Sequence, residues 1–151
     1  MKLKITLALL ALLSPNAFAK GDCSYCAKMD ELKASFAKVK PDAMNEKTID
    51  RQNELVDASA DLLKPVMKNT AKLSAEDWKR IMPFLGVVVQ YDYQNLVADE
   101  LLPVMGPGRE VFFNELKAAE KNGTIKGKDA DEIRVSFGTA EAIQERGNDD
   151  Q

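Results

Sequence analysis

Apolar residues near the start of the chain recur at helical spacing. Steps of four, three, four and three residues connect Tyr25, Met29, Leu32, Phe36 and Val39. This spacing places the five side chains on one face of a helix, which we predict over residues 23–40. Asp22 is available as its N-cap, and Pro41 ends it because proline cannot continue the backbone hydrogen bonds.

A longer amphipathic helix is predicted over residues 44–73, where two series of positions recur every seven residues. Pro65 lies inside this segment and removes the hydrogen bond to the Asp61 carbonyl. We therefore expect a kink there, or a break into two shorter helices. An eight-residue stretch around Pro65 recurs 38 residues later, around Pro103, with six identical positions. Both copies contain Pro-Val-Met, which we expect to mark bends or helix ends.

A third helix is predicted to start at Ser74, where a serine N-cap is followed three residues later by Asp77. Residues 81–89 are the most apolar stretch after the first 19 residues, and apolar residues continue to Leu102. A run that is apolar on nearly all sides is typical of a buried helix, so we expect one central helix here. A strand at the three valines 87–89 is the alternative, although no good partner strand is visible.

The rest of the chain predicts a fourth helix and an ambiguous last segment. Gly106-Pro107-Gly108 is a turn, and the helix after it ends at Asn122-Gly123. In the last segment a helical face fits Ile133, Phe137, Ala140 and Ile143, whereas alternation over 133–137 fits a strand. We favour a helix interrupted near Gly138, because a lone strand has no partner. The predicted fold is an all-α, single-domain bundle of four or five helices, kinked or broken at prolines.

The first 19 residues have the layout of a secretory signal peptide. Two lysines precede a short apolar run, and Ala17-Phe18-Ala19 is the small-x-small end after which we expect cleavage. The apolar run is too short to span a bilayer. We therefore predict a signal peptide over 1–19, a helical domain over 20–146 and a disordered acidic tail over 147–151. A periplasmic or secreted location follows, with no membrane insertion after cleavage.

Composition removes several function classes. The chain of 151 residues contains no histidine, which excludes Ser-His-Asp and Cys-His catalytic sets and the commonest zinc ligand. Glycine-rich nucleotide loops are absent from the sequence. Predicted cleavage removes two lysines and changes the net charge from −3 to −5. An acidic chain with no Lys/Arg cluster in its sequence is not typical of a nucleic-acid binder. We predict no cofactor and do not favour an enzyme.

Cys23-Ser24-Tyr25-Cys26 is the one motif with recognisable chemistry. Cysteines three apart on a helical turn have Cα atoms about 5 Å apart, within reach of a disulfide. In an exported protein we expect a local disulfide that pins the first turn. Two alternatives use the same pair: a redox-active dithiol at a helix N-terminus, or a Cu(I) site that adds Met29. Ordinary c-type haem attachment is excluded, because Ala27 stands where a histidine is required.

Aromatic residues supply the candidate partner-binding surface. Tyr91 and Tyr93 are two apart and cannot both face inward on one helix, so at least one should be near the surface. Together with Phe113 they are our candidates for binding a partner, against packing of the third helix on the fourth. The predicted function is non-catalytic recognition of an envelope protein, as an inhibitor, immunity-type protein or assembly factor. A small apolar ligand held between kinked helices is a further alternative.

Overall fold

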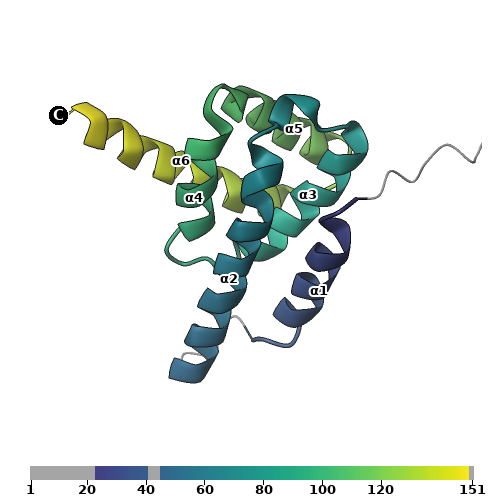
Figure 1. Cartoon of the computed structure of the whole chain (residues 1–151), viewed down its shortest axis with the longest axis vertical. Helices are drawn as coiled ribbons and strands as arrows, with labels where there is room; N and C mark the ends of the chain where they lie inside the picture. Colours follow the sequence, from purple (N-terminus) through teal and green to yellow (C-terminus); the bar gives the residue numbers. More distant parts are fainter. Residues whose placement is uncertain (1–22, 41–44, 150–151) are drawn as a thin grey trace, which may run out of the picture.

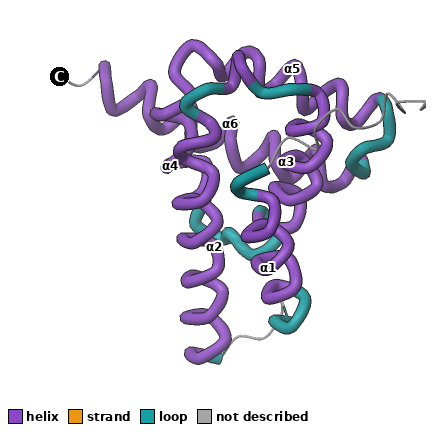
Figure 2. Tube along the Cα trace, turned by 45° about the vertical axis from the view of Figure 1, so that its right-hand side comes forward, coloured by secondary structure: helices purple, strands orange, loops and turns teal. Residues whose placement is uncertain are grey.

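The structure, a computed structural model, describes residues 23–40 and 45–149. These residues form helices and turns with no strand among them, which confirms the predicted all-α bundle. The helices are α1 (Cys26–Phe36), α2 (Glu46–Met67), α3 (Ala75–Val88), α4 (Leu96–Met105), α5 (Arg109–Lys121) and α6 (Gly127–Asp149), with 3-10 turns η2 (Thr70–Lys72) and η3 (Gly106–Gly108). Helix α4 contacts both α2 and α6, and α6 also contacts α3 and α5. The C-terminal part of α6 projects beyond the other helices (Figures 1 and 2).

Phe112 of α5 is the centre of an aromatic cluster in the core. Its ring centroid lies 4.7 Å from that of Phe137 on α6 and 6.3 Å from that of Trp78 on α3. All three side chains are buried. Because aromatic side chains bury large apolar areas, this contact fixes α3, α5 and α6 against one another.

The prediction of one central helix from Ser74 to Leu102 is wrong. The chain leaves α3 after Val88 and starts α4 at Leu96, with Asn95 in the left-handed region at φ 57°. The reason is Asp92, which is only 6% exposed and caps α4. Its Oδ1 accepts the Leu96 N–H at 2.8 Å and its Oδ2 accepts the Val97 N–H at 2.9 Å. Burial raises the pKa of this carboxyl, and the backbone N–H groups of α4 oppose that shift.

Pro65 does not break α2 into two helices. The helix continues for two residues past Pro65 and ends at Met67, six residues before the predicted end. Helix α4 likewise ends two residues past its own proline, at Met105. The expectation that the two Pro-Val-Met sequences mark helix ends is therefore confirmed. A proline near the C-terminus removes only one hydrogen bond of the last turns, which explains why the helix survives it.

The turn after α4 packs closely against the turn after α2. A Cβ atom added to Gly108 in η3 would lie 1.8 Å from the Thr70 hydroxyl oxygen in η2. Glycine, which has no Cβ, therefore leaves room at this position for the Thr70 side chain. This contact, together with an ion pair between Lys64 of α2 and Glu100 of α4, connects the two helices that carry the repeated sequence.

The predicted cap of α3 is confirmed and also joins α3 to α1. Ser74 Oγ accepts the Asp77 N–H at 3.2 Å, and the Asp77 carboxylate accepts the Ser74 N–H at 2.8 Å. The second oxygen of Asp77 accepts the Tyr25 hydroxyl at 2.5 Å. Hydrogen bonds from the side chain of Ser74 and then from Tyr25 hold the pKa of Asp77 below its ordinary value.

Replacing Asp77 by Asn should make stability less sensitive to acid. The native state binds a proton at Asp77 more weakly than the unfolded state does. The stability that Asp77 contributes is therefore present above the ordinary aspartate pKa of about 3.9 and is lost as the pH falls through the lower folded-state pKa. Urea midpoints at neutral pH and at about pH 3 should differ less for Asp77→Asn than for wild type. Asp30→Asn, at an exposed position of α1, is the control and should keep the wild-type difference.

The last segment is one helix, so the strand considered there does not form. The strand considered at the three valines 87–89 does not form either, because Val87 and Val88 are in α3. Helix α6 runs through Gly138, and the predicted interruption there is wrong. Glycine inside a helix costs about 1 kcal/mol, which the burial of Ile133 and Phe137 outweighs. The backbone of 147–149, assigned by sequence to the tail, is helical, whereas 150–151 lie outside the described residues. The side chains of Ala140 and Ile143 also lie outside them.

The predicted signal peptide over 1–19 and the predicted N-cap Asp22 fall outside the described residues. In the part of the chain that the structure does describe, none of the helices combines the length and the apolar character needed to cross a bilayer.

Candidate functional site

Cys23 and Cys26 form the predicted disulfide just before and at the start of α1. Their Cα atoms are 5.3 Å apart, and the Cys26 N–H donates to the Cys23 carbonyl at 3.1 Å. Met29 is 3% exposed and packs in the core with Leu32 and Phe36. A disulfide offers no thiolate to Cu(I), and Met29 is buried, so this arrangement does not assemble the three sulfurs as copper ligands. Within residues 23–40 and 45–149, no group of three His, Cys, Asp or Glu side chains is placed to hold a metal ion.

The three aromatic candidates occupy different environments. Tyr91 is buried, its ring centroid lies 4.8 Å from that of Phe36 with the two rings tilted by 35°, and its hydroxyl donates to the Phe36 or Val39 carbonyl. It therefore packs the α3–α4 loop on α1 and is not an open surface for a partner. Phe113 is half-buried edge-on against Phe112, with ring centroids 5.2 Å apart. Tyr93, in the same loop as Tyr91, is 64% exposed.

A hollow of about 380 Å³ lies beside Pro65, where a small apolar ligand was one predicted alternative. It is lined by residues of the disulfide loop and of the segment from α2 to α3: Ser24, Tyr25, Leu62, Pro65, Val66, Asn69 and Leu73. Ligand sites combine apolar walls with a few polar groups that fix orientation. The buried side-chain oxygens without a hydrogen-bond partner among the described residues belong to Glu132 and Ser136, and neither residue lines this hollow.

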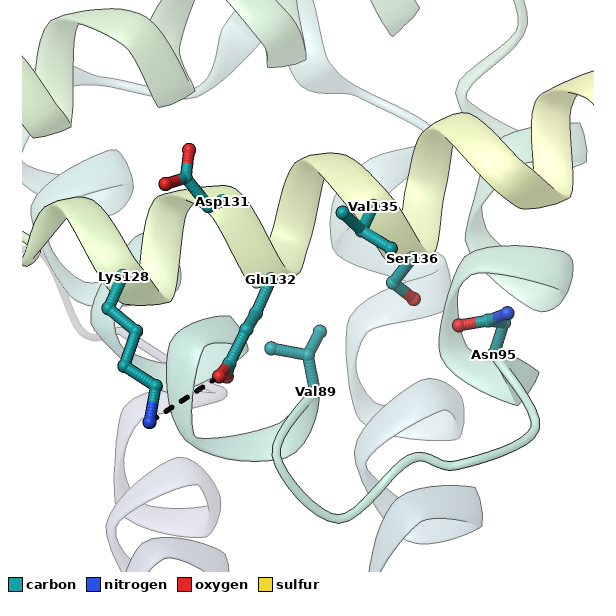
Figure 3. A pocket seen from close by; sticks show the side chains of 7 residues that line it. All are labelled: Val89, Asn95, Lys128, Asp131, Glu132, Val135 and Ser136. Atoms are coloured by element: carbon teal, nitrogen blue, oxygen red, sulfur yellow. Dashed lines mark ion pairs between the residues drawn. The ribbon is translucent and has the colours of Figure 1, made fainter.

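A larger hollow, of about 560 Å³, lies between α6 and the α3–α4 loop, and we call it the α6 hollow (Figure 3). Val89 and Asn95 line it from the two ends of the loop. On α6, Lys128, Glu132 and Ser136 are four residues apart and lie on the side that faces Val89, whereas Asp131 and Val135, also four residues apart, point to the other side of the helix (Figure 3). Val135 is 68% exposed at the edge of the hollow that it lines.

Two buried polar atoms in the α6 hollow have no hydrogen-bond partner among the described residues: Ser136 Oγ and Glu132 Oε2. Ser136 is only 5% exposed, and the other oxygen of Glu132 pairs with Lys128 Nζ at 3.7 Å. Ser59, a second buried serine inside a helix, donates to the carbonyl four residues before it at 2.7 Å. Ser136 makes no such bond. A buried polar group without a partner costs about 1–3 kcal/mol, so these two oxygens are the unusual feature of the α6 hollow.

Sequence reasoning missed this hollow, although a signal was present. Ser136 lies three residues after Ile133 and beside Phe137, so a helical assignment places it on the buried face. Val135 then falls on the exposed face. A helix that buries a serine and exposes the valine next to it reverses the usual pattern, and that reversal is typical of a binding surface.

The α6 hollow is suited to binding. It offers acceptor oxygens to a hydrogen-bond donor, and the side chains of Val89 and Val135 to an apolar group. Its serine and carboxylate are not hydrogen-bonded to each other, so they do not form an activated nucleophile of the kind that covalent catalysis needs.

Comparisons with protein-family models, with curated proteins and with solved structures found no match for this chain.

Proposed function

We propose that this protein recognises a protein partner in the cell envelope without catalysing a reaction, and that the α6 hollow is the contact. One observation carries the proposal: the buried hydroxyl of Ser136 has no partner among the described residues and lies next to the exposed side chain of Val135. Interfaces combine apolar contact with a few buried polar anchors, and this hollow has both. Export through the predicted signal peptide over 1–19 would bring the protein to that compartment.

The lining of the hollow supports one kind of contact group on the partner. Glu132 Oε2 and Ser136 Oγ can both accept, so the group they fit is a donor such as a lysine ammonium or an arginine guanidinium. The side chains of Val89 and Val135 fit an apolar neighbour of that group. The net charge of the chain, −3 over the full sequence and −5 after the predicted cleavage, favours a basic partner and would speed association with it. An inhibitor, an immunity-type protein and an assembly factor all act by such recognition.

Photo-crosslinking from position 135 tests the proposal. A benzophenone amino acid in place of Val135, in cells that produce the protein, should give an adduct with one envelope protein. The matched control is position 49, because Ile49 is also an exposed β-branched residue on a helix. In binding to the identified partner, Val135→Asp should weaken affinity about tenfold or more, as expected for a contact at the centre of an interface. Ile49→Asp should change it less than about twofold.

Equal adducts from positions 135 and 49, or none from 135, would overturn this assignment. The double variant Cys23→Ser with Cys26→Ser separates it from a redox role for the cysteine pair. If recognition is the function, this variant should keep the adduct, because the disulfide does not line the α6 hollow. Loss of the adduct with an unchanged circular dichroism spectrum would favour the redox alternative.

A further inference from the structure

A second hollow, of about 410 Å³, lies between the end of α1 and the start of α2, and we call it the basic hollow. Four of the residues that line it are cations: Lys38, Lys40, Lys47 and Arg51, with Val39 and Thr48 between them. Arg51 forms an ion pair with Glu54 at 2.8 Å. The three lysines are exposed and form no ion pair with any residue of the described part of the chain.

Two buried polar side chains hold the backbone that carries Lys38 and Lys40. Gln52 Nε2 donates to the Lys40 carbonyl at 3.2 Å, and the Tyr91 hydroxyl lies within hydrogen-bond distance of the Phe36 and Val39 carbonyls, at 3.1 and 3.2 Å. Gln52 is on α2 and Tyr91 is in the α3–α4 loop, so the segment after α1 is fixed from two sides. A site whose backbone is already ordered loses less entropy when it binds a ligand.

The placement of these charges is unfavourable without a ligand. Three lysines that form no ion pair within the described residues, placed around one hollow, repel one another. Lys47 also lies in the first turn of α2, where the helix dipole disfavours a cation. In a chain with more acids than bases, carboxylates that could neutralise this hollow are plentiful, yet Glu46 and Asp50 on α2 do not line it. An anion bound in the hollow would remove the repulsion.

We propose that the basic hollow binds a phosphate group. Lysine ammonium groups contact phosphate oxygens as point charges, and Arg51 adds planar donors that fit the same oxygens. The phosphate could belong to a soluble ligand or to a lipid headgroup, since both present the same oxygens. No sequence pattern indicates this site, because residues 38–51 also contain three acids and the cations are not consecutive. Asp42, one of those acids, lies outside the described residues.

Two titrations of the purified chain distinguish a soluble phosphate ligand from the phosphate of a lipid headgroup. Inorganic phosphate, followed by backbone amide chemical shifts, should give saturable shifts at the residues that line the basic hollow if the ligand is soluble. Vesicles of phosphatidylglycerol and phosphatidylcholine in equal parts should sediment the protein, and vesicles of phosphatidylcholine alone should not, if the ligand is a lipid headgroup. Either result supports the proposal, and binding to neither probe overturns it.

Variants assign the binding to these lysines. Lys40→Gln and Lys47→Gln should each weaken it about fivefold, because each removes one charged contact to the phosphate. Lys47→Arg keeps the charge and should retain the affinity. Lys117→Gln, at an exposed position of α5, is the matched control and should have little effect. If Lys117→Gln weakens binding as much as the other two, the attraction is non-specific and the assignment is wrong. All of these substitutions are at exposed side chains, and circular dichroism verifies that each variant is folded.

Discussion

Phe112→Ala is expected to destabilise the protein by about 4 kcal/mol, the largest effect of any single substitution considered. Phe112 is fully buried, and its ring contacts those of Trp78, Phe113 and Phe137. Removing it leaves a cavity where α3, α5 and α6 meet, and helices that are packed against one another can fill such a cavity only in part. Urea unfolding followed by circular dichroism should show the loss as a lower midpoint with a similar slope.

Phe113→Ala is the matched control, because the residue is of the same type, on the same helix and next in sequence. Its side chain is only half-buried, so truncation should cost less than half as much as at Phe112. Phe112→Leu keeps most of the volume and should lie between the two. If Phe112→Ala and Phe113→Ala lose equal stability, the aromatic cluster is not the centre of the core.

Asp92→Ala should cost about 3 kcal/mol, since it removes the cap of α4 and leaves the N–H groups of Leu96 and Val97 without acceptors. The effect should be seen in the urea midpoint and in faster amide hydrogen exchange over the first turn of α4. Both readouts follow from one cause, because the first N–H groups of a helix have no partner within the helix itself.

Two further variants separate capping from charge. Asp92→Asn keeps one acceptor and avoids burying a charge, so it should lose less stability than Asp92→Ala. Asp99→Ala removes an exposed acid from the first turn of the same helix and should cost well under 1 kcal/mol. If Asp99→Ala proves as harmful as Asp92→Ala, the contribution of Asp92 is the general attraction of an acid to the helix N-terminus rather than its two hydrogen bonds.

The two proposed binding sites share one physical feature. Each contains polar or charged side chains that have no hydrogen-bond or ion-pair partner among the described residues. In the α6 hollow these are the buried oxygens of Ser136 and Glu132. In the basic hollow they are three lysines without ion pairs in the described residues. The sites lie on different helices, so the variants at Val135 and at Lys47 should act independently. A variant of one site that also abolished binding at the other would indicate a loss of fold.

The sequence by itself determined the features that depend on neighbours along the chain. The apolar face of α1 with Met29, Leu32 and Phe36, the cap formed by Ser74 and Asp77, the helix ends after Pro-Val-Met and the disulfide between Cys23 and Cys26 were all predicted from spacing, although α1 ends at Phe36 and not at the predicted Lys40. The reason is physical: helical turns and capping bonds join residues only three or four positions apart. Such contacts are encoded locally, so a local pattern is sufficient to find them.

Only the tertiary structure decided the features that depend on contacts between distant segments. Tyr91 is in the core because the α3–α4 loop packs on α1, where the Tyr91 hydroxyl reaches a carbonyl 55 residues earlier in the chain. In the same loop Asp92 is buried and caps α4, which separates α4 from α3. Ser136 faces a hollow only because Val89 and Asn95 come to lie beside α6. Periodicity shows which residues share a face of one helix. Which other segment packs against that face, and which polar groups are left without a partner, is set by the packing of the whole bundle.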